Sequence, residues 1–505
     1  MKRLMPFLYV ALVYSLFYML VGVYQMSLGI RYYEALFISD KMLLLLSNNH
    51  KTLELINLIY PLLTHLLAIP PAFIDSLRAP LFTSSIGIAL FASYVIVKLH
   101  SLRLKFASGI SSIYFLCSPM LLFAATSGTS FYLYLVLYFI FFHFIFRYSR
   151  QFTVYNLIML SLCISAFIFL DYHILWIFIF TIPLFALLSL FNHSSQDLSY
   201  VGVYSLVTQS RTNRRDYLVR FFSSLTVVYF LPTVTLVLYF IINLWLTGNH
   251  VFFEISETSQ WNLSQFYNAT DTNTSGLKLL EYAAYLSPLF LILFLTARRR
   301  IIVLSALVIV PLWVVYSFRV YTGQQLFLTT LVLLPSAGIA CYIHLCQTKL
   351  LSRFRKSPTA SLLTFIIFSL MIVGEYYYFQ NTENPEEQNM LSLLKVNPVK
   401  TKIPAEDMAT YISTHLTNED RVLADNKIFY PTMALSRKSV LYVDQFTEDF
   451  NFALQFPEFY ADYLLVSKAS TVYHPTDLLV PVLKNADLKM TQVYSNLSFI
   501  LYKIK

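Results

Sequence analysis

The chain has 505 residues, of which 57% are hydrophobic and only 12% are charged. Soluble globular proteins usually contain about 25% charged residues, so this composition excludes an ordinary soluble enzyme and indicates a protein that crosses a membrane repeatedly. The formal net charge of +9 could suggest nucleic acid, but the Lys and Arg residues form short groups beside apolar runs, where they orient helices and meet anionic headgroups. Nucleic-acid binding is therefore excluded.

Apolar runs recur along the first 381 residues. A helix needs about 20 mainly apolar residues to cross the hydrocarbon layer, and about eleven segments meet this criterion. The first has a basic start and no small-residue cleavage site after it, which favours an uncleaved signal anchor. The expected fold is a polytopic α-helical membrane protein. The predicted spans are 4–24, 80–97, 106–125, 130–146, 153–170, 174–191, 221–246, 279–297, 301–318, 325–346 and 360–380.

Basic groups occur at every second boundary between these spans. Because positive residues stay on the cytoplasmic side of a membrane, this pattern predicts a cytoplasmic N-terminus and, with an odd number of spans, an outer C-terminus. Most acidic residues of the membrane part then lie outside, so acid-dependent chemistry is expected there. The basic groups are Lys2/Arg3, Lys98/Arg103/Lys105, Arg147/Arg150, Arg211/Arg214/Arg215/Arg220, Arg298/Arg299/Arg300 and Lys349/Arg353/Arg355/Lys356.

Two long outer loops are predicted. The apolar runs of loop 25–79 suit helices that lie in the membrane interface. Its stretch 56–74 could be a twelfth span, but it contains His65 and three prolines, and a crossing there would invert the charge pattern downstream. Loop 247–278 is polar and holds three Asn-x-Ser/Thr triplets, which arise by chance in such a loop. The triplets begin at Asn262, Asn268 and Asn273.

The four cysteines, Cys117, Cys163, Cys341 and Cys346, lie inside apolar spans without CxxC spacing. They are therefore interpreted as packing residues rather than as a disulfide framework or a metal site.

The composition becomes polar after Asn381, and residues 382–505 are predicted to form a small α/β domain outside the membrane, next to the membrane domain 1–381. A helix is expected over 405–416, where Met408, Ile412 and Leu416 recur at four-residue spacing. Short apolar runs then alternate with turns, as in a sheet with helices. These runs are 421–424, 439–443, 463–466, 492–494 and 499–502.

Several short sequence features follow one another in an informative order along the membrane part. Tyr33-Glu34-Ala35 follows the first span, an interfacial helix runs through Asp40, and Tyr60-Pro61-Leu62 comes next. The third span ends at Ser118-Pro119, before Ala124-Ala125-Thr126-Ser127-Gly128. This layout resembles the GT-C superfamily of polyprenyl-phosphate-sugar-dependent glycosyltransferases, in particular the protein mannosyltransferase and lipid A aminoarabinose transferase branch. Span ten, entered at Gln324-Gln325 and holding Pro335, and the terminal α/β domain also resemble parts of these enzymes.

Three positions depart from the pattern of that family. Tyr33 replaces the first acid of the usual pair, so only Glu34 remains. Asp171-Tyr172-His173 stands where many relatives have a Lys, and Gln325 stands at a commonly basic position, which leaves Arg319 as the nearest cation.

Sugar transfer needs a base for the acceptor hydroxyl, and a carboxylate at the membrane surface can serve because partial burial raises its proton affinity. Glu34 is the candidate base; the alternative is an ion pair of Glu34 with Arg31 or Lys41. Asp40 is the second catalytic candidate. It lies roughly 240° from Glu34 around a helix, so the two share a site only if the helix begins between them. The alternative is a solvated Asp40.

The departing phosphate needs cations or hydrogen-bond donors. Asp171 and His173 lie in a predicted outer turn between apolar helices, where ionisable groups are functional candidates; the alternative is that both sit in headgroup water. Arg319 offers a planar guanidinium that fits two phosphate oxygens, unless it snorkels to lipid headgroups. These three residues are the candidates at the donor phosphate. One clear outer acid is thin support for a metal site, so no firmly bound metal is predicted.

The leading prediction is a membrane glycosyltransferase of a bacterial inner membrane. It would move a sugar from a polyprenyl-phosphate donor to an envelope glycan, lipid or protein on the outer face. The loss of an acid at Tyr33 motivates the alternative, a non-catalytic GT-C-like scaffold or lipid-handling subunit of an envelope assembly. A transporter ranks last, because the spans show no evident duplication and hold their charges at the edges.

Overall fold

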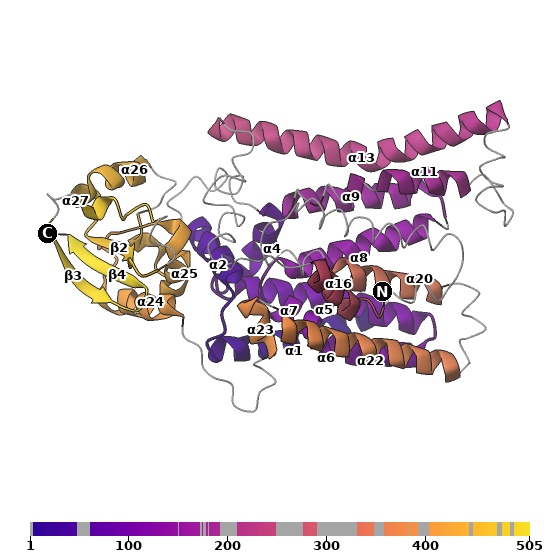
Figure 1. The fold of residues 1–505 in the computed structure, drawn as a ribbon, viewed down its shortest axis with the longest axis horizontal. Helices are drawn as coiled ribbons and strands as arrows, with labels where there is room; N and C mark the ends of the chain where they lie inside the picture. Colours follow the sequence, from indigo (N-terminus) through magenta and orange to yellow (C-terminus); the bar gives the residue numbers. More distant parts are fainter. Residues whose placement is uncertain are drawn as a thin grey trace.

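The structure is a computed structural model with two parts, a bundle of helices and a C-terminal α/β region that lies beyond one end of the bundle (Figure 1). It describes residues 4–47, 61–149, 151–171, 174, 178–179, 181–191, 210–248, 276–289, 331–347, 358–382, 384–391, 403–443, 448–471, 477–484 and 489–504.

The bundle is built from long apolar helices that share one large core. Two short helices, α2 and α4, stand at the end of the bundle next to the α/β region, and α23 follows the last long helix (Figure 1). The helices of this part are α1 (Leu4–Ser27), α2 (Tyr33–Leu46), α4 (Leu62–Ala72), α5 (Ala79–Ser101), α6 (Lys105–Cys117), α7 (Pro119–Thr126), α8 (Phe131–Tyr148), α9 (Val154–Leu170), α11 (Thr181–Phe191), α13 (Arg211–Thr247), α16 (Gly276–Leu286), α20 (Leu333–Cys346), α22 (Pro358–Asn381) and α23 (Pro385–Leu391).

In the described part of the chain, five helices are long and apolar enough to cross a membrane, namely α1, α5, α8, α13 and α22. The bent pair α6 and α7 adds a sixth if it is one span, and α4, α9 and α20 are shorter apolar helices. The protein is therefore an integral membrane protein. The prediction of eleven spans stays a prediction, because 301–318 and residues 290–297 of the predicted span 279–297 lie outside the described residues, as do the triplets of loop 247–278.

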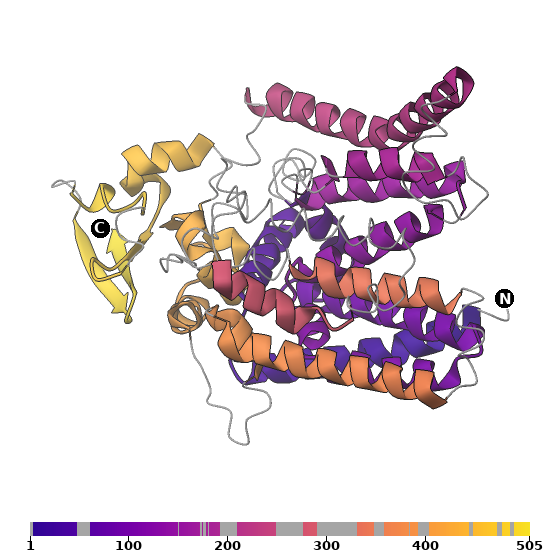
Figure 2. The ribbon, with the colours of Figure 1, turned by 45° about the vertical axis from the view of Figure 1, so that its right-hand side comes forward.

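The helix α13 lies at the edge of the bundle (Figures 1 and 2). Only 17% of its most apolar stretch is buried inside the protein, compared with 78% for the corresponding stretch of α8. Apolar side chains such as Phe222, Phe230 and Trp245 are exposed along it. An apolar helix with so little protein around it is suited to contact with lipid.

The break between α6 and α7 bends the chain by 60°. Proline disfavours helical backbone at the residue before it, and Ser118, which precedes Pro119, has extended backbone. The Ser118 side chain accepts a hydrogen bond from the Leu121 backbone N–H at 3.1 Å, so it caps the new helix. The predicted third span, 106–125, is thus two helices.

The C-terminal region folds around a four-stranded sheet of order β1-β2-β4-β3. Strands β1 and β2 are parallel, and the other neighbours are antiparallel. Both faces are covered: α24 and α25 pack on one face and α26 on the other. The run predicted at 439–443 begins as a 3-10 helix, η3, and then makes an isolated parallel bridge between Tyr442 and Val422. The elements are α24 (Pro404–His415), β1 (Val422–Ala424), α25 (Asn426–Ser436), η3 (Ser439–Leu441), α26 (Glu448–Gln455), α27 (Pro457–Tyr460), β2 (Tyr463–Ser467), η5 (Val482–Lys484), β3 (Met490–Ser495) and β4 (Phe499–Ile504).

Helix α2 joins the two parts. Leu36 and Phe37 on α2 share an apolar cluster with Tyr430 and Ala434 on α25. The rings of Phe37 and Tyr430 meet edge to face, with centroids 5.5 Å apart, an arrangement that aromatic pairs prefer. The C-terminal region therefore packs directly on the helix that carries Glu34.

Candidate active site at the end of the bundle

The first turn of α2 is held by a carboxylate from α23, the last helix of the bundle in the sequence. The helix begins at Tyr33, and the side chain of the preceding Tyr32 makes no capping hydrogen bond. Instead, the Tyr33 backbone N–H donates to Oε1 of Glu386 at 2.7 Å. A negative charge at a helix N-terminus is favourable, because the unpaired N–H groups and the helix dipole attract it. Glu386 thereby ties α23 to α2.

Glu34 reaches across from α2 to a second helix N-terminus. Its Oε1 accepts a hydrogen bond at 2.6 Å from the backbone N–H of Ser130, the residue that precedes α8. The turn before α8 contains Gly128, whose φ of +71° places it in the left-handed region. A Cβ at Gly128 would lie 3.2 Å from the Cβ of Ala35, so this turn packs closely on α2. The carboxylate of Glu34 is thus fixed in place and partly exposed.

Glu34 and Glu386 lie close enough for their charges to interact. Burial, and then the negative charges of Glu34 and Glu387, raise the pKa of Glu386 to about 7, although the hydrogen bond from Tyr33 opposes this shift. Two carboxyl groups from distant parts of the chain therefore form a pair at the end of the bundle. The sequence shows only one acid at this motif, and the structure brings in a second.

Asp40 lies on another face of the same helix. Both residues belong to α2, which begins at Tyr33, so the separation of roughly 240° directs their side chains apart. Asp40 is 3% exposed, and its Oδ2 forms an ion pair at 3.1 Å with Nζ of Lys41, which is 1% exposed. The interpretation of Asp40 as a solvated residue was wrong, because α2 packs against the C-terminal region there.

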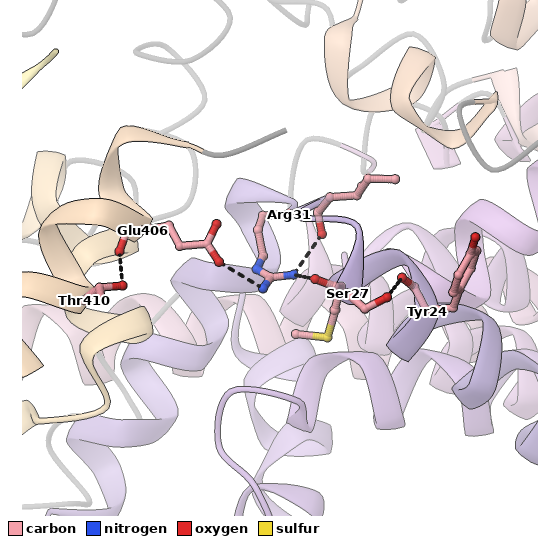
Figure 3. A network of polar contacts seen from close by, with 7 residues as sticks. Tyr24, Ser27, Arg31, Glu406 and Thr410 are labelled. Carbon is pink, nitrogen blue, oxygen red and sulfur yellow. Dashed lines mark hydrogen bonds and ion pairs between the residues drawn. The ribbon is translucent and has the colours of Figure 1, made fainter. Parts of the chain in front are cut away.

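Arg31 does not need Glu34 for an ion pair, because it forms one with the C-terminal region (Figure 3). Its Nη2 lies 3.6 Å from Oε1 of Glu406 in the first turn of α24. Its Nη1 donates to the carbonyl oxygens of Met26 at 2.6 Å and Ile30 at 3.3 Å. A cation is favourable beside the last carbonyls of a helix. Arg31 therefore links the end of α1 to the C-terminal region.

Asp171 follows the last residue of α9 and is 1% exposed. The Tyr134 hydroxyl donates to its Oδ2 at 3.3 Å. The alternative that Asp171 sits in headgroup water is therefore wrong, since helix α8 covers it. The other two candidates at the donor phosphate, His173 and Arg319, lie outside the described residues.

Glu375 is a buried acid inside the bundle that was not among the candidates predicted from the sequence. It is 0% exposed and binds both sides of the break between α6 and α7. Its Oε1 accepts from the Tyr114 hydroxyl at 2.7 Å, and its Oε2 accepts from the Ser118 hydroxyl and, at 3.4 Å, from the Met120 backbone N–H. Glu375 thus secures the bend that leads to the turn beneath Glu34.

The sequence analysis missed Glu386. A usable signal was present in Pro385-Glu386-Glu387, two acids directly after the last span and therefore at the same end of the bundle as Glu34. Within the described residues, no three His, Cys, Asp or Glu side chains are grouped so that they could hold a metal ion.

A comparison with solved structures identifies the fold. No protein-family model matches the sequence, and no curated protein matches it. The structure, however, is similar to the crystal structure of ArnT from Cupriavidus metallidurans bound to undecaprenyl phosphate, with a TM-score of 0.51 and 14% identity, over 99% of this chain and 97% of that chain. It is also similar to the apo state of the same ArnT, with a TM-score of 0.50 over the same shares.

The chain has the GT-C fold. The resemblance that the sequence features suggested is thereby confirmed at the level of the fold. Within this fold, the first turn of α2 brings Glu34 and Glu386 near each other.

Proposed function

We propose that this protein is a glycosyltransferase that moves a sugar from a polyprenyl-phosphate donor to a hydroxyl group of an envelope glycan, lipid or protein. The observation that carries the proposal is the position of Glu34, a partly exposed carboxylate fixed where α2, α8 and α23 meet at the end of a GT-C bundle. The similar ArnT structure was solved with undecaprenyl phosphate, which supports a polyprenyl phosphate as the carrier of the sugar.

The proposed reaction is a direct displacement at the sugar carbon. Glu34 takes the proton of the acceptor hydroxyl, the acceptor oxygen forms a bond to the anomeric carbon, and the bond from that carbon to the phosphate oxygen breaks. The electron pair of that bond leaves with the polyprenyl phosphate. The hydrogen bond from Ser130 fixes the direction of the carboxylate, and such positioning of a base is a large part of its catalytic effect.

The other candidate residues have different proposed roles. Arg319 and His173 remain the proposed contacts for the departing phosphate, since its charge calls for cations. Asp40, bound to Lys41, is proposed to keep α2 against the C-terminal region rather than to react. Asp171, covered by α8, is proposed to orient its turn, because a carboxylate repels a phosphate.

The proposed place of the reaction is the outer face of a bacterial inner membrane, with residues 382–505 as an outer domain. The charge pattern supports this orientation, because the basic groups occupy the opposite ends of the spans. The α2 end of the bundle, with both carboxyl groups and the C-terminal region, would then face outward.

A scaffold without catalytic activity is the second candidate, and Tyr33 is the observation that favours it, because one acid of the family motif is missing there. The pairing of Glu34 with Glu386 weakens this argument. Glu386 supplies a second carboxyl group near Glu34 through its contact with the Tyr33 backbone, which the local sequence does not show.

Purified protein in lipid nanodiscs, given radiolabelled polyprenyl-phosphate sugars and crude envelope acceptors, tests the proposal. We expect transfer by the wild type and a loss of about 10²- to 10⁴-fold in Glu34→Gln, as for removal of a general base. Glutamine can still accept the bond from Ser130, so the fold is retained. The exposed Glu419→Gln is the matched control and keeps full activity. Equal rates in wild type and Glu34→Gln remove Glu34 from the mechanism, and no transfer with any donor supports the scaffold.

A further inference from the structure

Glu386 reaches the candidate site from 353 residues further along the chain than Tyr33. Its backbone N–H donates to Oδ1 of Asn384 at 3.0 Å, which caps the short helix α23 and fixes where the side chain starts. Its Oε1 then accepts from the residue next to Glu34. Glu386 is therefore held both at its backbone and at its carboxyl group, and it lies near the proposed base.

The buried side chain of Tyr32 lies near Glu386. Tyr32 is 4% exposed, and its hydroxyl has no hydrogen-bond partner within the described residues. Burial and, second, the charge of Glu386 raise the pKa of Tyr32, so its hydroxyl keeps its proton. A buried hydroxyl without a partner is uncommon and calls for an explanation. Here it leaves one hydrogen-bond donor available near Glu386.

We propose that Glu386 is a positioning residue for Glu34: it fixes the first turn of α2 and, by holding or releasing its own proton, sets how readily Glu34 takes the proton of the acceptor hydroxyl. This inference rests on the proposed function of Glu34 as a base. An ionised Glu386 strengthens the attraction of Glu34 for a proton, and a protonated Glu386 weakens it, because like charges at short distance oppose each other.

Few other charged groups of the described residues face this pair. On α23 itself, Glu387 accepts hydrogen bonds from the hydroxyls of Tyr378 and Thr382, at 3.0 and 2.6 Å, and so turns toward the end of α22. Glu375 of α22 is bound to the break between α6 and α7, and α7 carries no charged side chain. Among the charged groups that act on Glu386, Glu34 has the larger effect and Glu387 the smaller one.

The pH profile of kcat/KM tests the proposal. Glu386→Gln keeps an oxygen that can accept from Tyr33 but removes the charge. The charge of Glu386 appears only as this group ionises near pH 7, and there it makes Glu34 a stronger base. We expect the wild-type rate to rise a further few-fold through this pH, and Glu386→Gln to lose this rise. KM for the acceptor should stay within about twofold of the wild-type value, since no direct contact is removed. Glu419→Gln, which changes an exposed acid of the C-terminal region, is the control and keeps this rise.

A role for Glu386 in the fold alone predicts a different result. Glu386→Gln would then lower the rate by the same factor at every pH and keep the rise near pH 7, and this outcome overturns the proposal.

The melting temperature of the substrate-free protein between pH 4 and 8 gives a second readout that needs no activity. We expect Glu34→Gln to move the titration assigned to Glu386 to lower pH, because it removes a neighbouring negative charge. An unchanged midpoint shows that the two groups are not coupled and contradicts the proposal. If the wild type transfers no sugar with any donor, the proposed function fails separately, and this measurement still decides whether the coupling exists.

Discussion

Two groups of glutamates in this protein illustrate two uses of the same side chain. Glu375, inside the bundle, is fully buried and accepts hydrogen bonds from two hydroxyls and a backbone N–H. Glu34 and Glu386, at the end of the bundle, are partly exposed and each binds a backbone N–H at a helix N-terminus. The buried acid is surrounded by donors, as expected for a group that holds structure. The pair is fixed but partly exposed.

The two groups are connected through the chain. Glu375 secures the bend before α7, and α7 leads into the turn whose Ser130 binds Glu34. The comparison therefore predicts that changes at Glu375 act first on folding, whereas changes at Glu34 act on chemistry alone.

The largest effect on stability is expected from Glu375→Ala. This change leaves the hydroxyls of Tyr114 and Ser118 buried without their acceptor, at a cost of about 1–3 kcal/mol for each. A loss of roughly 2–6 kcal/mol should appear as a clear fall in melting temperature in detergent. Glu375→Gln, which retains one acceptor, should fall less. A melting temperature equal to that of the wild type would show that this network does not hold the bend.

A second effect depends on pH and concerns Glu387. Burial raises its pKa from 4.5 to about 7, although hydrogen bonds from Thr382 and Tyr378 oppose this shift. The folded state binds this proton more tightly than the unfolded state, so the contribution to stability is fully present below pH 4.5 and is lost as the pH rises through about 7. Glu387→Gln should therefore flatten the fall in melting temperature over this range. The same slope in both proteins would rule out this assignment.

Gly374→Ala tests the packing beside Glu375. A Cβ at this position would lie 2.0 Å from the backbone oxygen of Tyr285, so α16 and α22 must move apart, at about 1–3 kcal/mol. Gly109, on α6, has nothing within 4 Å of such a Cβ. Gly109→Ala is the matched control and should be neutral or slightly stabilising, because alanine favours a helix over glycine. Equal melting temperatures for the two variants would contradict the close contact.

The smallest effect is expected from Glu406→Gln, which breaks the ion pair with Arg31. The pair is partly exposed, with side-chain exposures of 13% and 29%, and pairs of this kind contribute about 1 kcal/mol or less. The melting temperature should drop slightly, and the difference from the wild type should shrink in high salt. A fall in melting temperature as large as that of Glu375→Ala would mean that this ion pair determines how the C-terminal region packs on the bundle.

The sequence was sufficient for the class of fold and for one member of the candidate site. Apolar run lengths predict membrane helices such as α5 and α8, and the spacing of Met408, Ile412 and Leu416 predicts α24, because both signals are local. The bend at Pro119 was visible only as the end of a span. Local patterns cannot show which distant residues meet.

The pairing of Glu386 with α2 could not be predicted for that reason. It depends on how α22 and α23 pack against the start of α2, a contact between residues 353 positions apart. The burial of Asp40 depends in the same way on the docking of α25. The GT-C resemblance pointed to Glu34, but it could not supply a partner that comes from outside the motif.

Glu34 is proposed to act in chemistry and Glu375 in folding. The most direct test measures the initial rate of sugar transfer and the melting temperature of Glu34→Gln and Glu375→Ala side by side, at a temperature where both are folded. We predict that Glu34→Gln melts like the wild type but transfers sugar about 10²- to 10⁴-fold more slowly. Glu375→Ala should melt at a lower temperature and keep more of its activity than Glu34→Gln. A Glu34→Gln protein that melts early, or one that transfers sugar at the wild-type rate, would contradict this prediction.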